Sequence, residues 1–305
     1  MTPSPQNPGL VNWLSIIALG AIWGGAFLAT KLALDGFGPW WVAAGRVGIA
    51  ALAITVLGGM MGQGLHQIKG VRSWLFVCAF GLTSVATGMA LLAFGQQHVP
   101  SAFAGISMGA VPLLILPLAA VFSKEEHIGP RQIAGFLVGF IGLAVLLGPD
   151  ALSSSGRDLE QWGQIACIGT AASYAVGSII MRRSPHMPQL ALAAATLWVG
   201  TVVLVPIALV IEGPPASLDR PAGYALLYAA LIPTAVGAIL RVRIITSAGS
   251  VFMSLSSYMV PVWSVVLGAL LLGEDLTRSM LWGMGLVLGG IAISQSRALM
   301  SLLRK

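Results

Sequence analysis

Charged residues are scarce in this chain of 305 residues, of which only 9% are Asp, Glu, Lys or Arg. A soluble domain carries about 25% charged residues, so the composition excludes an ordinary soluble enzyme or binding module. Hydrophobic residues make up 57% of the chain, and its mean hydropathy is +0.90. These values predict an integral membrane protein, in which each helix that crosses the bilayer needs about 20 apolar residues.

Residues that build disulfides, metal sites and catalytic sites are also few. The two cysteines, Cys78 and Cys167, lie in separate apolar segments without a CxxC motif, which predicts buried thiols. The four histidines lie in loops or at the ends of apolar segments. An intramembrane enzyme would need a nucleophile with a base, or a metal cluster, at depth. We therefore expect no enzyme activity, no catalytic residue, no metal and no cofactor.

The net charge of +6 comes from basic residues in loops, without a basic run or patch, so we expect no nucleic-acid partner. Eleven Lys and Arg residues fall on the side that would hold both termini and the even-numbered loops, and four fall on the other side. Because cytoplasmic loops of membrane proteins are enriched in Lys and Arg, this asymmetry predicts that both termini are cytoplasmic.

Ten apolar segments, bounded by Gly, Pro or charged residues, follow one another along the chain. They cover residues 12–34, 39–60, 73–94, 100–122, 130–148, 160–181, 187–211, 221–242, 248–271 and 277–296. Backbone groups in lipid must be satisfied within their own segment, and the alternating polarity of a membrane barrel strand does not occur, so these segments should be helices. The expected fold is an all-α polytopic membrane protein with ten transmembrane helices.

The second half of the sequence repeats the first at an offset of 149 residues. Matching pairs include Trp13 and Trp162, Pro112 and Pro261, and Glu125 and Glu274. Each half holds five segments, an odd number, so the second half should be inverted relative to the first. Inverted repeats are typical of secondary transporters, whose substrate site lies near the bilayer midplane. We predict repeats at residues 12–148 and 160–296 that form one transmembrane domain; the alternative is a duplicated scaffold without a transport role.

Small, polar and aromatic side chains near the middle of segments 1, 3, 4, 6, 8 and 9 are the candidates for a substrate site. The candidate substrate-binding residues are Trp23, Phe27, Phe80, Ser84, Thr87, Met108, Ser173, Tyr174, Ser178, Thr234, Ser254, Ser257 and Tyr258. Membrane Ser and Thr also bond to their own backbone or to a neighbouring helix, which is the structural alternative for the hydroxyls. The aromatic candidates lie near the centres of their segments, whereas belt aromatics lie at the membrane interfaces.

Three prolines inside the segments, Pro112, Pro233 and Pro261, are candidate gating residues. A membrane proline can simply kink its helix, but a kink also frees carbonyl groups and lets a helix end bend. The segments carry no Asp or Glu near mid-depth, where a proton-driven pump normally has its relay. This favours a facilitator, with coupling at a helix end as the alternative. Arg46 lies well inside the second segment, and we expect it to snorkel or to pair with a neighbouring helix end, with a contact to substrate as the alternative.

The run ALGAIWGGAFLATKLAL at 18–34, followed by PWWVAAGRVGIAALAI at 39–54, resembles the opening of EamA-type proteins of the drug/metabolite transporter superfamily. The proline-centred fourth and ninth segments, the acidic residue after each, and the glycine-rich segments that follow them also resemble that family. The resemblance covers essentially the whole chain. It implies ten helices, cytoplasmic termini, a central cavity formed by helices 1, 3, 4, 6, 8 and 9, and alternating access.

Members of this superfamily include exporters of amino acids and small metabolites, sugar-phosphate and nucleotide-sugar carriers, and drug-efflux proteins. Carriers of anionic phosphates would be expected to have cavity Lys or Arg, so the aromatic and hydroxyl lining here is more similar to that of exporters of aromatic and neutral amino acids. We therefore expect a uniporter of such substrates in the bacterial inner membrane. The alternative is a multidrug efflux protein for lipophilic compounds coupled to proton entry. The expected partners are a small-molecule substrate and the lipid bilayer, and the protein should be a monomer or a weak homodimer.

Replacing Ser254 and Tyr258 together should lower transport without unfolding the protein. The hydroxyl face of the ninth segment is expected to meet the polar end of the substrate, and the Gly105–Met108–Gly109 face of the fourth segment its apolar end. Efflux from liposomes, measured beside the thermal stability of the purified variant, checks this assignment. Unchanged transport would contradict it.

Overall fold

A computed structural model describes residues 9–122, 129–148, 158–215, 221–296 and 300, over which the backbone forms helices and turns but no strand. The predicted all-α class is therefore confirmed. Eight of the helices in these residues are long and apolar enough to cross a bilayer. Two shorter apolar helices of 17 residues, Ser256–Leu272 and Arg278–Ser294, complete the described chain.

The helices follow the apolar segments closely. The α-helices are α1 Leu10–Leu34, α2 Pro39–Met60, α3 Val71–Phe80, α4 Thr87–His98, α5 Ser101–Gly109, α6 Val111–Phe122, α7 Pro130–Leu147, α8 Asp158–Arg182, α9 Gln189–Glu212, α10 Pro221–Leu231, α11 Gly237–Met253, α12 Ser256–Leu272 and α13 Arg278–Ser294. A short 3₁₀ helix, η1, covers Leu65–Gln67, and two π-helical turns cover Gly81–Ala86 (η2) and Ile232–Val236 (η4).

The boundary between the eighth and ninth segments differs from the expected loop at 243–247. Helix α11 continues through these residues, and the chain changes direction at Gly249, whose φ is 87° and ψ 165°. Glycine adopts positive φ readily because it has no Cβ, so one residue suffices where a loop was expected. The turn at Ser254 and Leu255 then separates α11 from α12.

Both π turns lie in the third helical segment of their half. Shifting η2 by 149 residues gives 230–235, which overlaps η4 at Ile232–Val236. In η4 the ring of Pro233 removes a backbone donor and favours a wider turn. The π turn η2 has no proline. Thr87, directly after it, donates its backbone N–H to the carbonyl oxygen of Leu82, five residues earlier, and its hydroxyl Oγ1 also donates to that oxygen at 2.9 Å. Wide turns of this kind are frequent at functional sites.

The chain forms two compact units. Unit 1 contains residues 1–28, 100–161 and 236–305, and unit 2 contains residues 29–99 and 162–235. Each unit takes helices from both halves of the sequence.

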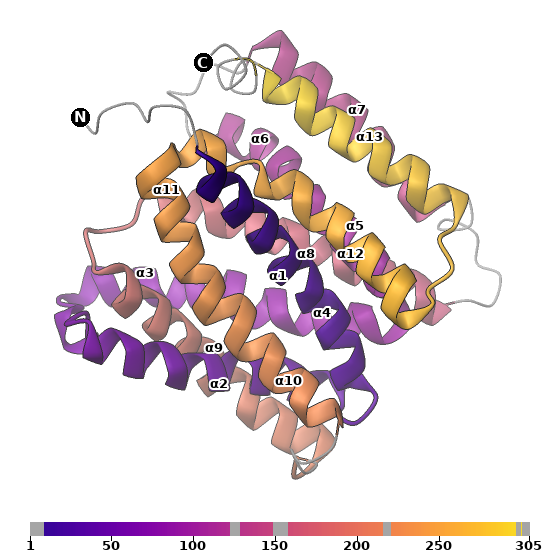
Figure 1. Cartoon of the computed structure of the whole chain (residues 1–305). Helices are drawn as coiled ribbons and strands as arrows, with labels where there is room; N and C mark the ends of the chain where they lie inside the picture. Colours follow the sequence, from indigo (N-terminus) through magenta and orange to yellow (C-terminus); the bar gives the residue numbers. More distant parts are fainter. Residues whose placement is uncertain (1–8, 123–128, 149–157, 216–220, 297–299, 301–305) are drawn as a thin grey trace. The chain divides into compact units, whose positions relative to one another are not determined.

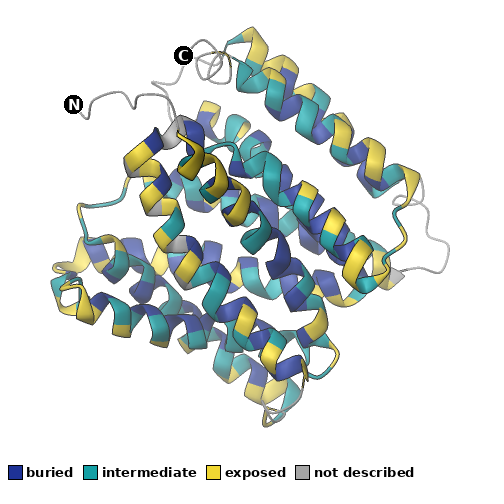
Figure 2. Ribbon diagram, in the orientation of Figure 1, coloured by how far each residue is buried: buried dark blue, intermediate teal, exposed yellow. Residues whose placement is uncertain are grey.

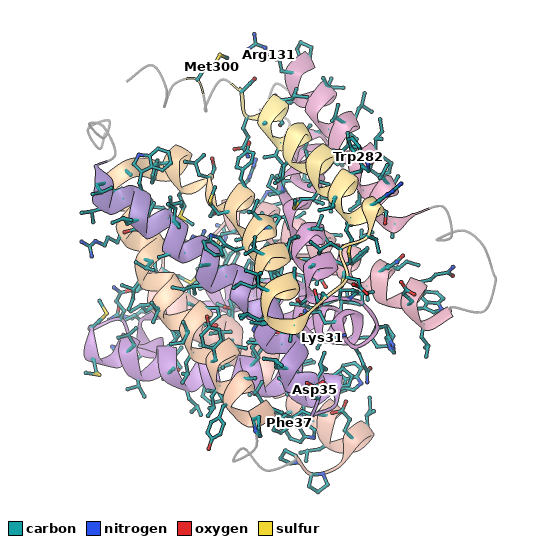
Figure 3. The ribbon with its side chains drawn as sticks, turned by 45° about the vertical axis from the view of Figure 1, so that its right-hand side comes forward. Lys31, Asp35, Phe37, Arg131, Trp282 and Met300 are labelled. Atoms are coloured by element: carbon teal, nitrogen blue, oxygen red, sulfur yellow. The ribbon has the colours of Figure 1, made fainter. Side chains whose placement is uncertain are left out.

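In unit 1, α7 and α13 run side by side in opposite directions (Figure 1). Gly135 of α7 faces Gly290 of α13, and Leu146 near the end of α7 faces Gly283 near the start of α13. Figure 2 shows exposed residues along one side of this pair, and Trp282, 70% exposed, projects from α13 in Figure 3. Helix α5 packs on α12 in the same unit.

In unit 2, α2 and α9 pack together, and the start of each helix is capped by a side chain at the end of the other. The Glu212 carboxylate at the end of α9 accepts the backbone N–H groups of Trp40 and Trp41 at 2.9 and 3.0 Å. At the other end, Gln63 Oε1, just after α2, accepts the N–H of Leu190 at 3.1 Å. The first turn of a helix has unpaired N–H groups, which these side chains satisfy. Gln63 and Glu212 are themselves 149 residues apart.

Replacing Gly290 by Ala should destabilise the protein by about 1–3 kcal/mol, because the added methyl would overpack a close helix contact. A Cβ at this position would lie 2.6 Å from Gly135 O and from Gly139 N, both backbone atoms of α7. The neighbouring Gly289 has open space around it, so Gly289→Ala is a matched control. Thermal unfolding of both variants in detergent, monitored by tryptophan fluorescence, measures the difference in stability between them. Equal midpoints for the two variants would show that the contact does not contribute to stability.

Candidate functional site

The candidate residues of α1 and α5 belong to unit 1 and lie among close helix contacts. A Cβ on Gly237 of α11 would lie 2.6 Å from Trp23 Nε1, so the indole occupies the space that this glycine leaves. Phe27 is buried, and its ring reaches Gly105 of α5. Met108 is the one residue between Ser101 and Ala110 whose side chain is partly accessible. These contacts bring α1 together with α5 and α11.

The hydroxyl face of the ninth segment makes contacts of its own in unit 1. Ser254 Oγ donates to Gln295 Oε1, just after α13, at 3.1 Å. The Tyr258 ring packs on a small cluster formed by Leu113, Val287 and Ile291. Its hydroxyl is buried and has no hydrogen-bond partner among the described residues. These contacts are those of helix packing, and a substrate role for Ser254, Ser257 and Tyr258 stays a prediction.

Two of the three candidate gating prolines, Pro112 and Pro233, lie at irregular points of their helices. Pro112 is the second residue of α6, directly after the turn at Ala110 that divides the fourth segment. Pro233 lies within η4, and Pro261 lies inside α12. Two prolines outside our prediction, Pro117 in α6 and Pro206 in α9, also lie inside helices.

In unit 2, two candidate serines join the third segment to α8 by exchanging hydrogen bonds with the opposite backbone. Ser84 Oγ in η2 donates to Ser173 O at 3.1 Å, and Ser173 Oγ donates to Thr83 O at 2.9 Å. A Cβ on Gly177 of α8 would meet Ser84 and the Phe80 ring, so this contact is close. The hydroxyls of Ser84 and Ser173 therefore bond to a neighbouring helix, which is the structural role that we gave as the alternative to substrate binding.

The remaining candidates of unit 2 differ in their surroundings. Ser178 Oγ donates to Tyr174 O of its own helix at 2.9 Å, and Thr87 is exposed. Thr234 is half-buried beside Pro233 in η4. Among the described residues, the partner of the Tyr174 hydroxyl is the Met89 thioether at 3.8 Å, which is a weak acceptor.

One charged residue inside unit 2 was not among our candidates. Arg46 of α2 donates from Nη1 to Thr30 Oγ1 of α1 at 3.0 Å. Its Nε is buried without a hydrogen-bond partner among the described residues, and the Tyr174 phenol lies within electrostatic range of its charge. The sequence signal was available, since an ionisable residue within a membrane segment is a functional candidate by default. We had favoured a structural role because the sequence does not reveal which neighbours the guanidinium meets.

Charged residues at helix ends are used as caps. In unit 1, Glu274 after α12 accepts the backbone N–H of Ser101 at 2.6 Å and of Ala102 at 3.0 Å, at the start of α5. In unit 2, Lys31 near the end of α1 (Figure 3) donates to Gln96 O and Val99 O at the end of α4, at 2.8 and 3.1 Å. Both arrangements also match the helix dipole. The repeat partner of Glu274, Glu125, lies outside the described residues.

Comparison with known proteins gives matches along nearly the whole chain. The EamA-like transporter family matches residues 12–148 and again residues 161–295. A protein of Streptantibioticus cattleyicolor, named probable terminal-alkyne amino-acid exporter, is 26% identical over 94% of each chain. The uncharacterized inner membrane transporter YedA of Escherichia coli is 26% identical over 92% of this chain and 89% of its own length. A crystal structure with 21% identity aligns at a TM-score of 0.66, covering 94% of this chain and 98% of the other, and shows the same fold.

Replacing Ser84 and Ser173 together by Ala should destabilise the protein by about 1–3 kcal/mol, because two hydrogen bonds between helices are lost. Ser178→Ala is the matched control on α8, since its hydroxyl bonds only to its own helix. The measurement is thermal unfolding of the purified variants in one detergent. A double variant as stable as Ser178→Ala would contradict a role for this pair in joining the third segment to α8.

Proposed function

The chain belongs to the EamA-like transporter family, and we propose that it exports aromatic or neutral amino acids, or similar small neutral metabolites, across the bacterial inner membrane. One observation carries this proposal: the family matches the chain twice, over residues 12–148 and 161–295. The relatives named as an amino-acid exporter and as an inner membrane transporter support the substrate class and the location.

The proposed architecture has ten transmembrane helices in two inverted five-helix repeats, residues 12–148 and 160–296, with both termini in the cytoplasm. Two structural features recur at the 149-residue offset and support it. The π turns η2 and η4 overlap at this offset, and the caps Gln63 and Glu212 are related by it. Because Gln63 caps α9 while Glu212 caps α2, the equivalent residues act at opposite ends of one antiparallel pair, as an inverted repeat requires.

In the proposed mechanism, helices of both repeats bend at their irregular points during alternating access. The turn at Ala110 with Pro112, and the turn at Ser254–Leu255 followed by Pro261, interrupt the fourth and ninth segments. A helix with an interrupted backbone ladder can bend at that point at little cost. We propose that bending there opens and closes the two sides in turn, with the candidate residues of the sequence analysis around the substrate.

The proposed transport is a uniport of neutral or zwitterionic molecules. In the described part of the chain, every Asp and Glu lies at or beyond a helix end, and Glu212 and Glu274 are occupied as helix caps. A proton-coupled efflux protein for lipophilic cations would need a carboxylate at depth, both to bind the cation and to relay the proton. The placement of the acidic residues therefore favours export of neutral amino acids over multidrug efflux.

Purified protein in liposomes loaded with radiolabelled tryptophan, threonine or alanine should give saturable efflux of at least one of them. A uniporter should show the same initial rate with and without a pH gradient, because no proton crosses with the substrate. Protein-free liposomes provide the background leak.

The result that contradicts amino-acid export is the absence of saturable efflux for every neutral amino acid. A rate that follows the pH gradient would contradict the uniport mechanism alone. Efflux of a lipophilic cation driven by that gradient would instead support the multidrug alternative.

A further inference from the structure

Arg46 is the basis of a second proposal, which rests on the proposed function and concerns the chemistry of the substrate. We propose that the Arg46 guanidinium, oriented by Thr30, binds the carboxylate of the transported molecule. The proposed substrates are therefore molecules with a free carboxylate, such as zwitterionic amino acids. Amides and amines derived from them would not be substrates.

Arg46 is half-buried in unit 2, on a stretch of α2 that has no exposed side chain. It is the eighth residue of α2, about 10 Å along the helix axis from Pro39. Between residues 39 and 51 of α2 no side chain is exposed, and the lipid-exposed positions begin at Leu52. Val42, Ala43, Val47 and Ala50, which surround Arg46 on the helix, are all at most 1% exposed. The covered positions around Arg46 argue against snorkelling along the outside of the helix.

On two other sides of α2, glycines of α2 contact side chains of neighbouring helices. Gly45 faces Leu226 of α10, and Gly48 faces Thr201 of α9. Arg46 itself reaches α1, where Thr30 accepts its hydrogen bond. Segment 1 is one of those expected to line the transport pathway. Arg46 therefore contacts a helix along which the substrate was predicted to pass.

The contacts of Arg46 leave its charge uncompensated within the protein. A guanidinium has five N–H donors, and here one contact, from Nη1 to Thr30 Oγ1, is made to a neutral hydroxyl. Nε has no hydrogen-bond partner among the described residues, and no described acidic side chain pairs with Arg46. By contrast, Lys31 on the preceding helix is held by two carbonyl groups at the end of α4. A structural arginine would be expected to have such partners, because an unpaired charge away from water is strongly unfavourable.

The geometry suits a carboxylate better than other anions. Two parallel N–H groups of a guanidinium match the two oxygens of a carboxylate, and this charge-assisted pair is among the strongest that side chains form. A doubly charged phosphate would be better matched by more than one cation. Thr30, fully buried at 1% exposure, acts as the positioning residue for the guanidinium.

The test compares each amino acid with its amide, in which a neutral group of similar size replaces the carboxylate. Binding of the L-amino acids tryptophan, phenylalanine, threonine and alanine, and of their four amides, is measured by calorimetry on the full-length protein in detergent. In Arg46→Gln, binding of the acids should weaken about tenfold to a hundredfold, while binding of the amides stays within twofold. Arg131→Gln, which removes an exposed arginine at the start of α7, is the matched control and should bind like the wild type.

Thr30 supplies a second line of evidence that does not depend on the folding of Arg46→Gln. Thr30→Val keeps the arginine but removes the oxygen that orients it, and should weaken binding of the acids about threefold to tenfold. Thr30→Ser keeps the hydroxyl and should restore wild-type affinity. A purely structural threonine would affect acids and amides alike, and the comparison of the two ligand sets separates these roles.

The proposal is overturned if wild-type protein binds amides as tightly as acids, or binds none of the acids. It is also overturned if Arg46→Gln leaves acid binding unchanged, or weakens acids and amides equally. Should Arg46→Gln fail to fold, equal effects of Thr30→Val on acids and amides would overturn it. Acid binding that depends on Arg46 without any efflux from liposomes would contradict the proposed transport function and leave the carboxylate site standing.

Discussion

The need to satisfy every backbone polar group without water governs this structure more than any other constraint. In lipid, an unpaired N–H or C=O group costs several kcal/mol, so each irregular point of a helix requires a partner from the protein. The carboxylates of Glu212 and Glu274 bind the free N–H groups at the starts of α2 and α5. Lys31 binds the last carbonyls of α4, and Ser173 binds a carbonyl of the π turn η2. Polar side chains that resemble a functional set in the sequence are thus partly required by the backbone.

A second consequence is that helices associate through small residues. Lipid tails are as apolar as leucine, so burial alone gives little force between helices, and close packing has to supply it. Backbone-to-backbone approach at Gly135 and Gly290 joins α7 to α13, and Gly105 brings α5 against Phe27 and Ser264. Several of the 38 glycines of the chain thus serve helix contacts, in addition to those used in turns. The same contacts leave aromatic rings such as Trp23 in spaces next to a glycine, where a ring serves packing whatever its role in transport.

The acidic residues and Arg46 differ in how the protein uses their charges. Acidic residues of the described chain lie at helix ends, and two of them neutralise the partial charges of helix starts. Arg46 has a single neutral contact within α1 and no acidic partner among the described residues. The proposed carboxylate site would therefore use a charge that the fold itself leaves unmatched. An exporter that takes zwitterionic substrates needs such a group only for the anionic end, since an ammonium can be met by hydroxyl and carbonyl oxygens.

The sequence by itself determined the helical class, the positions of nearly all helices and the family, because hydropathy is a property of single segments and lipid permits only helices there. It also gave the 149-residue correspondence that the π turns and the caps Gln63 and Glu212 follow. Only the tertiary structure decided which polar groups are used by the backbone and which are available. Ser84 and Ser173 bond to each other's helices, whereas Arg46, for which we expected a structural role, has Thr30 as its one hydrogen-bond partner among the described residues. The physical reason is that a hydrogen bond between helices depends on which residues face each other across a contact, and helical spacing fixes only one side of that contact.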